Sequence, residues 1–220
     1  MKNLAVGIFH DEELGRELGK KGTESDIAMF NRKTEDSIFT FLSPVEDKLT
    51  AKSQIMSNID AAILSIQNMT PEVGETILML DSFGISQGIV IVPHYTDLHQ
   101  IQALIKGTAR SSFLIKERDS SSILGFLNES TQQRNLNDHP LVTVDHSFSV
   151  RGVGEVVLGF VKKGTVRKHD NLLLLPANKE VVIRSIQMQD KEVDEADAGS
   201  RVGLAIKGAI SEEMKRGSLL

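Results

Sequence analysis

The chain has 220 residues and a net charge of −5, with 40% hydrophobic and 25% charged residues; this composition excludes a wholly disordered protein, and the length favours two domains. It contains no cysteine, which excludes disulfides, thiolate metal sites and a cysteine nucleophile. Its apolar runs are much shorter than the roughly 20 residues of a membrane span and no signal-peptide pattern opens it, so we expect a cytoplasmic protein without a membrane partner.

Short apolar runs alternate with amphipathic stretches over the first 128 residues. A strand at 4–9 and a helix opened by Asp11 to Glu13 come first, and two strand-like runs at 27–32 and 37–42 suit a hairpin. Helices and strands then alternate, at residues 49–58, 61–66, 71–80, 88–92, 97–105, 112–115 and 121–128. Strands that are apolar on both faces predict an α/β fold, a mostly parallel sheet with helices on both faces.

In such a sheet, ligands bind beyond the carboxyl ends of the strands. We therefore expect the chemistry of the first half in four loops, at residues 10–13, 43–47, 67–70 and 93–97.

The helical spacing disappears after a polar segment at 129–138. Short strands rich in Val, Ile and Leu follow, separated by glycine-containing turns, at residues 141–150, 155–161, 171–175, 180–187 and 202–206. Several short strands at this spacing favour a small closed β-barrel. We therefore predict two domains, at residues 1–137 and 138–220.

The second half resembles domain 2 of translational GTPases, in particular elongation factor Tu and the archaeal selenocysteine-specific elongation factor. The resemblance rests on the stretches VDHSFSVRGVGEVVLGFVKKGTVRKHDNLLLLP and AGSRVGLAIKG. The first half resembles the GTP-binding domain of the same family in its order of elements and in the fragment NIDAAIL. In that family a third domain follows the residues that match 216–220, which leaves open whether one was removed after Leu220.

The resemblance implies GTP binding, but the phosphate-loop motif does not carry over. That loop needs G-x-x-x-x-G-K-[ST], in which backbone N–H groups and a lysine hold the phosphates. The matching segment has one glycine and three acids, Asp11, Glu12 and Glu13. Because carboxylates repel phosphate and favour a helix amino end, we expect these acids to block the phosphate site. The nearest similar string, GRELGKK at 15–21, is one residue short and lies inside the predicted helix.

The family's other nucleotide motifs are also lost. The magnesium-side motif, Asp-x-x-Gly followed by His, falls on Leu42-Ser43-Pro44-Val45-Glu46, and the guanine-reading Asn-Lys-x-Asp retains only Asp97. We interpret the chain as a pseudo-GTPase with no cofactor, in which Asp97 is also explained as a helix N-cap. The alternative is an active GTPase with an altered pocket for GTP and magnesium, in which Asp97 reads guanine, Tyr95 stacks on the base and Lys20 or Lys21 reaches a phosphate.

In the family, domain 2 helps to hold the aminoacyl end of transfer RNA. Residues 139–220 hold 12 Lys and Arg against 11 Asp and Glu, compared with 13 against 19 in residues 1–138, so a polyanion contact fits the second half better. The residues that the resemblance places at an RNA or partner surface are Asp145, His146, Arg151, Lys162, Lys163, Arg167 and Lys168. The basic residues around Gly164 form either a solvated turn or phosphate contacts, and four such contacts would give a salt slope of about −3 to −4.

The sequence leaves three partners open for this elongation-factor-like chain, namely transfer RNA, the ribosome or another protein. The non-RNA alternative is a scaffold that acts by protein contacts alone. We expect no DNA partner. The six histidines show no metal-ligand spacing, so we expect no metal site.

Overall fold

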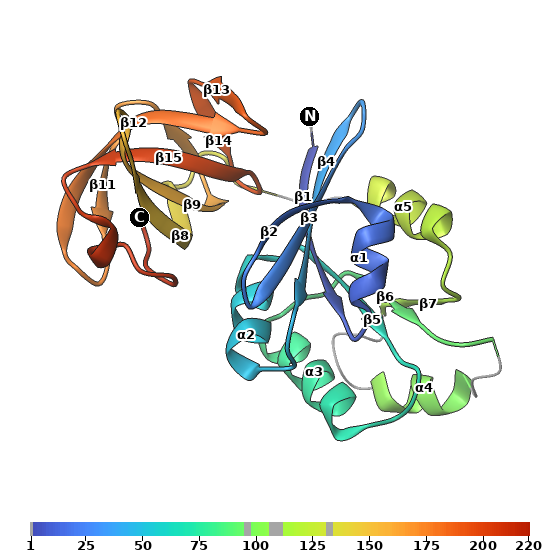
Figure 1. Cartoon of the computed structure of the whole chain (residues 1–220). Helices are drawn as coiled ribbons and strands as arrows, with labels where there is room; N and C mark the ends of the chain where they lie inside the picture. The colour runs from blue at the N-terminus through green and yellow to red at the C-terminus, as the bar shows by residue number, and fades with distance from the viewer. Residues whose placement is uncertain (1, 95–97, 106–111, 131–133) are drawn as a thin grey trace. The chain divides into compact units, whose positions relative to one another are not determined.

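The computed structural model describes residues 2–94, 98–105, 112–130 and 134–220 (Figure 1). The chain divides into two compact units, Met1–Gln132 and Gln133–Leu220. The domain boundary predicted at 137/138 stays a prediction. None of the helices in the described part of the chain is long and apolar enough to cross a membrane.

The first unit contains a seven-stranded, mostly parallel sheet, as the apolar strand pattern predicted. Its strand order is β2-β3-β4-β1-β5-β6-β7, and β1, β4, β5, β6 and β7 run parallel. The antiparallel strands β3 and β2 extend the sheet beyond β4. The strands span Lys2–Phe9 (β1), Lys20–Glu24 (β2), Ile27–Lys33 (β3), Ser37–Pro44 (β4), Ala61–Ser65 (β5), Gly88–Ile91 (β6) and Leu114–Lys116 (β7).

Helices cover both faces of this sheet (Figure 1). On one face, the leucines of α1 and α5 pack with Leu4, Val6 and Ile8 of β1 in a single core cluster. On the other face, Ile55 of α2 and the following Ile59 lie against Gly7 of β1. The helices span Glu12–Leu18 (α1), Leu49–Asn58 (α2), Pro71–Ser82 (α3), Leu98–Ile105 (α4) and Ser120–Glu129 (α5).

The helix predicted after β1 is shorter than expected, and β2 was missed. Helix α1 ends at Leu18, and Gly19 continues in extended conformation. A Cβ atom on Gly19 would lie 3.2 Å from backbone atoms of Asn31, so the chain passes close to β3 at this point. Lys20 and Lys21 therefore belong to strand β2, where Lys20 pairs with Asn31. Strand β2 lies at the edge of the sheet, and Lys20, Lys21, Gly22 and Glu24 are exposed. It therefore carries no alternation of apolar and polar residues from which to predict it.

The second unit is the predicted β-barrel. Its main sheet has the order β11-β12-β15-β9-β8, with β13 beside β12, and β10 pairs with β14. Two of the short strands, β13 and β14, lie in the acidic segment at residues 190–197. The strands span Leu141–Val150 (β8), Gly154–Lys163 (β9), Thr165–Arg167 (β10), Asn171–Leu174 (β11), Lys179–Met188 (β12), Lys191–Val193 (β13), Glu195–Asp197 (β14) and Arg201–Lys207 (β15).

The last residues of the chain close this barrel. The segment 217–220 lies between β8 and the end of β11, where it makes backbone hydrogen bonds to both neighbours. Leu220 exchanges two with Val142, at 2.7 and 2.9 Å, and Leu219 exchanges two with Leu175, at 2.8 and 3.0 Å. The enclosed core consists of aliphatic side chains from every side of the barrel, including Val157, Ile186 and Leu204.

Candidate functional site

The connection from β1 to α1 lies at the carboxyl edge of the parallel sheet, where ligands of such folds bind. Only His10 and Asp11 separate the two elements. His10 has a left-handed backbone with φ of 64°, and the Asp11 carboxylate accepts a hydrogen bond from the Leu14 backbone N–H at 3.0 Å. A loop of two residues is too short to wrap a phosphate chain, which takes several consecutive backbone N–H groups.

Arg118 holds Asp11 in this position. It lies between β7 and α5, and its guanidinium contacts Asp11 Oδ2 at 2.8 Å and Glu17 at 2.8 Å. Hydrogen bonds to Asp11 and Glu17 raise the pKa of Arg118. Sequence reasoning missed this residue, although its place just after β7 puts it at the same carboxyl edge as His10 and Asp11.

The side chains of the three acids, Asp11, Glu12 and Glu13, have different surroundings. Only Asp11 accepts a hydrogen bond from a backbone N–H at the amino end of α1. Glu12 pairs with Arg16, one turn further along the helix, at 2.6 Å, and Glu13 is exposed.

A buried lysine lies next to this connection. Lys52 of α2 is fully buried and its ammonium contacts Asp47 and also Glu75 of α3, the latter at 2.7 Å. Burial opposes its positive charge, but the hydrogen bonds to Asp47 and Glu75 prevail and raise the pKa of Lys52. His10 Nε2 lies 3.0 Å from the Thr76 hydroxyl, and burial lowers the pKa of His10 against the opposing effect of Asp47.

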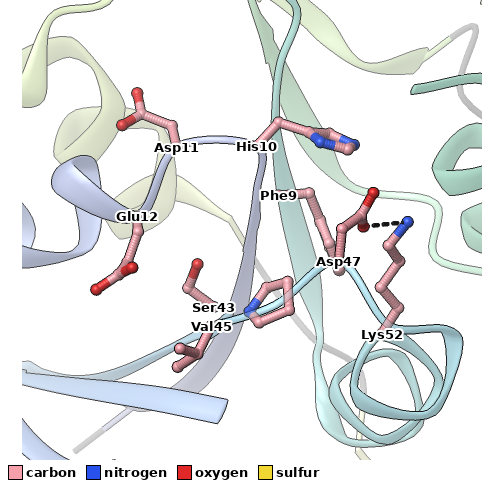
Figure 2. Close-up of a pocket in the computed structure, with 9 residues that line it drawn as sticks. Phe9, His10, Asp11, Glu12, Ser43, Val45, Asp47 and Lys52 are labelled. Carbon is pink, nitrogen blue, oxygen red and sulfur yellow. Dashed lines mark ion pairs between the residues drawn. The ribbon is translucent and has the colours of Figure 1, made fainter. Parts of the chain in front are cut away.

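These residues surround a cavity of about 220 Å³ (Figure 2). Polar groups form more of its wall than apolar groups, and Ser43, Asp47 and Lys52 are among its polar residues. Figure 2 shows the side chains of Asp11 and Glu12 turned away from Asp47. The cavity is lined by Phe9, His10, Asp11, Glu12, Ser43, Pro44, Val45, Asp47 and Lys52.

The other predicted nucleotide residues are not gathered at this cavity in the described part of the chain. Tyr95 and Asp97 lie outside the described residues. Lys20 lies on edge strand β2, opposite Asn31, and not in the loop that would hold a phosphate. His94 precedes the guanine-reading segment and contacts Glu117 at 2.5 Å, a hydrogen bond that raises the pKa of His94.

In the barrel, Asp145 is a buried structural residue, contrary to its expected place at a partner surface. It is 7% exposed and contacts His146 at 3.0 Å, Arg216 at 3.4 Å and Arg201 at 3.8 Å. A carboxylate that is buried against Arg201 and Arg216 is not exposed at a partner surface. Burial lowers the pKa of Arg201, and the negative charge of Asp145 opposes that effect.

The basic residues of the expected RNA surface do not form one patch. Arg151 is exposed in the turn before β9, whereas Lys162 and Lys163 end that strand, about 30 Å away at roughly 3.3 Å per residue. Arg167 contacts Glu195 at 3.2 Å, and the nearby Lys168 contacts Glu192 at 3.1 Å. Acidic partners on β13 and β14 therefore neutralise part of the basic turn.

A groove of about 240 Å³ lies on the outer face of the barrel, and sequence reasoning did not predict it. Phe148 is 42% exposed there, and Gly203 opens the space between Leu158 and Gln187. The groove is lined by Phe148, Val150, Val153, Val156, Leu158, Ser185, Gln187, Gly203 and Ala205. It combines an accessible aromatic face with two side chains, Ser185 and Gln187, that are able to form hydrogen bonds.

A mostly parallel sheet covered by helices, joined in sequence to a closed barrel, defines a two-domain protein of the α/β-plus-barrel class. Residues 154–220 match the family model of elongation factor Tu domain 2. The whole chain is 41% identical to an uncharacterized protein of Methanocaldococcus jannaschii, of which it covers 72%. It is also 31% identical to the selenocysteine-specific elongation factor of that organism, again over its full length, and covers 56% of that relative.

The crystal structure of translation elongation factor SelB from Methanococcus maripaludis, in complex with the GTP analogue GppNHp, has a similar fold. Its TM-score is 0.83 at 26% identity, and the match covers 100% of this chain and 54% of that chain. The chain therefore belongs to the translational GTPase superfamily, among proteins similar to elongation factor Tu and to selenocysteine-specific elongation factors. It spans about half the length of those two selenocysteine-factor relatives.

Proposed function

We propose that this chain is a nucleotide-free relative of translation elongation factors, and that its barrel binds the end of a single-stranded RNA. The observation that carries the first part is the Asp11 carboxylate, which accepts from the Leu14 N–H at the amino end of α1 and is held by Arg118. A phosphate bound there would compete with a carboxylate that the chain itself supplies.

Electrostatics supports the same conclusion. A carboxylate about 5 Å from a phosphate costs roughly 3 kcal/mol at an effective dielectric constant near 20, whereas attraction to a helix amino end is worth about 0.3 to 1 kcal/mol. Arg118 offsets part of this repulsion, but it is already shared between Asp11 and Glu17. At the positions of the family's magnesium-side motif, Leu42 is buried and cannot bind a metal.

The groove on the barrel supports the second part. Bases of single-stranded RNA stack on exposed aromatic side chains, and Phe148 offers such a face at the groove. A glutamine can form two hydrogen bonds to the edge of an adenine, and Gln187 lines the same groove. Arg151 follows β8 in an exposed turn, two residues before Val153 of the groove, and is the cation that we assign to a neighbouring phosphate.

The relatives give this proposal its setting. They include proteins named selenocysteine-specific elongation factor and elongation factor 1-alpha, and the resemblance of the barrel to domain 2 implies contact with the aminoacyl end of transfer RNA. We therefore propose a transfer RNA acceptor end as the RNA, which places the chain in translation. The ribosome and a protein partner are the competing outcomes.

Equilibrium titration with fluorescent GTP and GDP analogues, with and without magnesium, tests the nucleotide part. We expect no saturable binding, and the Methanococcus maripaludis factor, whose structure holds a GTP analogue, serves as the positive control. Micromolar, magnesium-dependent affinity would refute the nucleotide-free state and favour the altered-pocket GTPase.

Fluorescence anisotropy with a short single-stranded RNA of the acceptor-end sequence tests the RNA part. Loss of base stacking is worth about 1–3 kcal/mol, so Phe148→Ala should weaken binding by roughly fivefold to more than a hundredfold. Leu173→Ala is the matched control, because Leu173 is similarly exposed but lies on β11, outside the groove.

Salt dependence separates this groove from the basic turn. One phosphate contact, by Arg151, gives a slope near −0.7 for a single strand, whereas contacts by the four basic residues around Gly164 give about −3. A slope near −3 that Arg151→Ala leaves unchanged would refute the groove as the RNA site. Salt-independent association with a protein, and no retention of RNA, would favour the protein scaffold.

A further inference from the structure

Arg216 holds the segment that closes the barrel against the middle of β8. It immediately precedes residues 217–220, named here the closing segment, in which the Gly217 N–H donates to the Val144 oxygen at 2.9 Å. The Nε of Arg216 donates to the backbone oxygen of Asp145 at 3.2 Å, and its Nη2 lies 3.4 Å from Asp145 Oδ1. Arg216 therefore fixes the amino end of the closing segment beside β8.

A β-bulge brings two side chains of β8 to Arg216. Val144 and His146 pair with consecutive residues of β9, so Asp145 lies between them without a partner in the ladder. In a regular strand, neighbouring side chains point to opposite faces, but a bulge bends the strand and redirects a side chain. The side chains of Asp145 and His146 both lie next to the guanidinium of Arg216 as a result.

The contact between His146 and Arg216 defines the protonation state of the imidazole. His146 Nε2 lies 3.5 Å from Arg216 Nη2. Because a guanidinium has only donors, Nε2 acts as the acceptor, so the imidazole is neutral and its proton is on Nδ1. Nδ1 lies 3.0 Å from Asp145 Oδ2, and both atoms are buried without an aligned hydrogen-bond partner in the described part of the chain.

Protonation of His146 would change these contacts in opposite directions. A proton on Nε2 removes the acceptor that faces Arg216 and places two positive charges side by side. The same charge draws the imidazole toward Asp145 Oδ2, which already lies 3.8 Å from Arg201 of β15. Among the described residues, the charged groups in contact with His146 are Asp145 on its own strand and Arg216. A protonated His146 and Arg216 then compete for one carboxylate.

We propose that His146 is an acid-sensitive switch on the closing segment: its protonation displaces Arg216 from Asp145, and residues 217–220 then separate from β8 and from the end of β11. The His146 side chain is 38% exposed, so it can take up a proton while Asp145 stays buried. Histidine is the side chain that ordinarily changes its charge between about pH 5 and 8, which sets the interval of the test. The inference goes beyond the proposed function, because it concerns closure of the barrel whether or not the barrel binds RNA.

Hydrogen exchange of the full chain, followed residue by residue by NMR, tests this switch. The amides of Gly217, Leu219 and Leu220 donate hydrogen bonds to β8 and to Leu175, so they report opening of the closing segment. Their protection, relative to the intrinsic exchange rate at each pH, should fall about two- to tenfold between pH 7.5 and 5.5, the effect of losing one hydrogen bond. The amides of the central strand β15 should remain more strongly protected at pH 5.5, because the segment opens while the rest of the barrel stays folded.

Three variants assign the effect to His146. His146→Gln keeps an acceptor for Arg216 but does not titrate, so its closing segment should have the same protection at both pH values. His139→Gln is the matched control and should show the full decrease, since His139 is exposed in the segment before β8. Arg216→Met should lower the protection at pH 7.5 and remove the further decrease, because it deletes the group that the protonated imidazole displaces.

The natural chain alone can overturn the proposal, even if a variant does not fold. Unchanged protection of the closing segment between pH 7.5 and 5.5 would overturn it, and so would an NMR titration in which His146 takes up no proton over that interval. Equal protection of the closing segment and of β15 at pH 5.5 would show that the whole barrel unfolds, which also contradicts a local switch. Among the variants, a decrease that persists in His146→Gln would exclude His146 as its cause.

Discussion

Replacing Asp11 by alanine measures how strongly the chain closes the amino end of α1. The variant loses the N-cap hydrogen bond to Leu14, which is worth about 1 kcal/mol. It also loses the ion pair to Arg118, which we discount to about 0.5–1 kcal/mol because the Arg118 side chain is 34% exposed. The free energy of unfolding of the first unit should therefore fall by roughly 1.5–2 kcal/mol, a loss of about 5–7 °C in Tm for a unit of this size.

Two further variants divide this loss between its two sources. Asp11→Asn keeps a good N-cap residue and loses only the charge, so it should cost about 0.5–1 kcal/mol, and Arg118→Met should cost a similar amount. Urea denaturation followed by circular dichroism supplies the values. If Asp11→Ala were as stable as the natural chain, or if Asn and Ala were equally harmful, Asp11 would not cap the helix and the argument for a self-filled phosphate site would fail.

Three other measurements test further features. Burial keeps the pKa of His10 below 6.5. The stability that His10 contributes is therefore present above pH 6.5 and is lost as the pH falls below that value. The urea midpoint of the natural chain should fall between pH 7.5 and 5.5, and His10→Asn should flatten this decline. The pKa of His94 lies above 6.5 because of Glu117, so its stabilisation is present below pH 6.5 and is lost as the pH rises through the raised pKa; Glu117→Gln should return the NMR-measured pKa toward 6.5, and no change would contradict the contact. Deleting residues 217–220 removes the segment that joins β8 to the end of β11 and should abolish the cooperative thermal transition of the barrel, whereas an unchanged transition would show that the barrel closes without it.

The strands of the sheet were predictable because burial leaves a direct mark on the sequence. A strand such as β5, which is buried on both faces along its whole length, has a continuous apolar sequence. The N-cap Thr70 and the first-turn Pro71 indicate the start of α3. Strand β2 leaves no such mark. Its position depends on Gly19 passing close to the backbone of Asn31, a contact between residues that no local pattern connects.

The candidate site was predictable in its location but not in its contacts. The rule for parallel sheets places His10 and Asp11 at the ligand-binding edge, but nothing in the neighbourhood of Asp11 in sequence indicates Arg118, more than 100 residues later. For the same reason, the burial of Asp145 could not be predicted from the sequence. Its partners Arg201 and Arg216 lie on distant segments, so the sequence could not distinguish a buried ion-pair network from an exposed partner surface.

The contacts around β1 fit a chain that replaces a ligand with its own side chains. The free N–H groups at the start of a helix need hydrogen-bond acceptors. A helix whose amino end held a phosphate loses the phosphate acceptors when the nucleotide is absent. Asp11 fills that need, and Arg118 and Lys52 balance carboxylates at the same edge. A protein stabilised by a ligand gains RT ln(1 + [L]/Kd) on binding, whereas one that supplies its own contacts gains nothing. The first unit should therefore be fully stable without nucleotide, and added GTP and magnesium should leave its Tm unchanged.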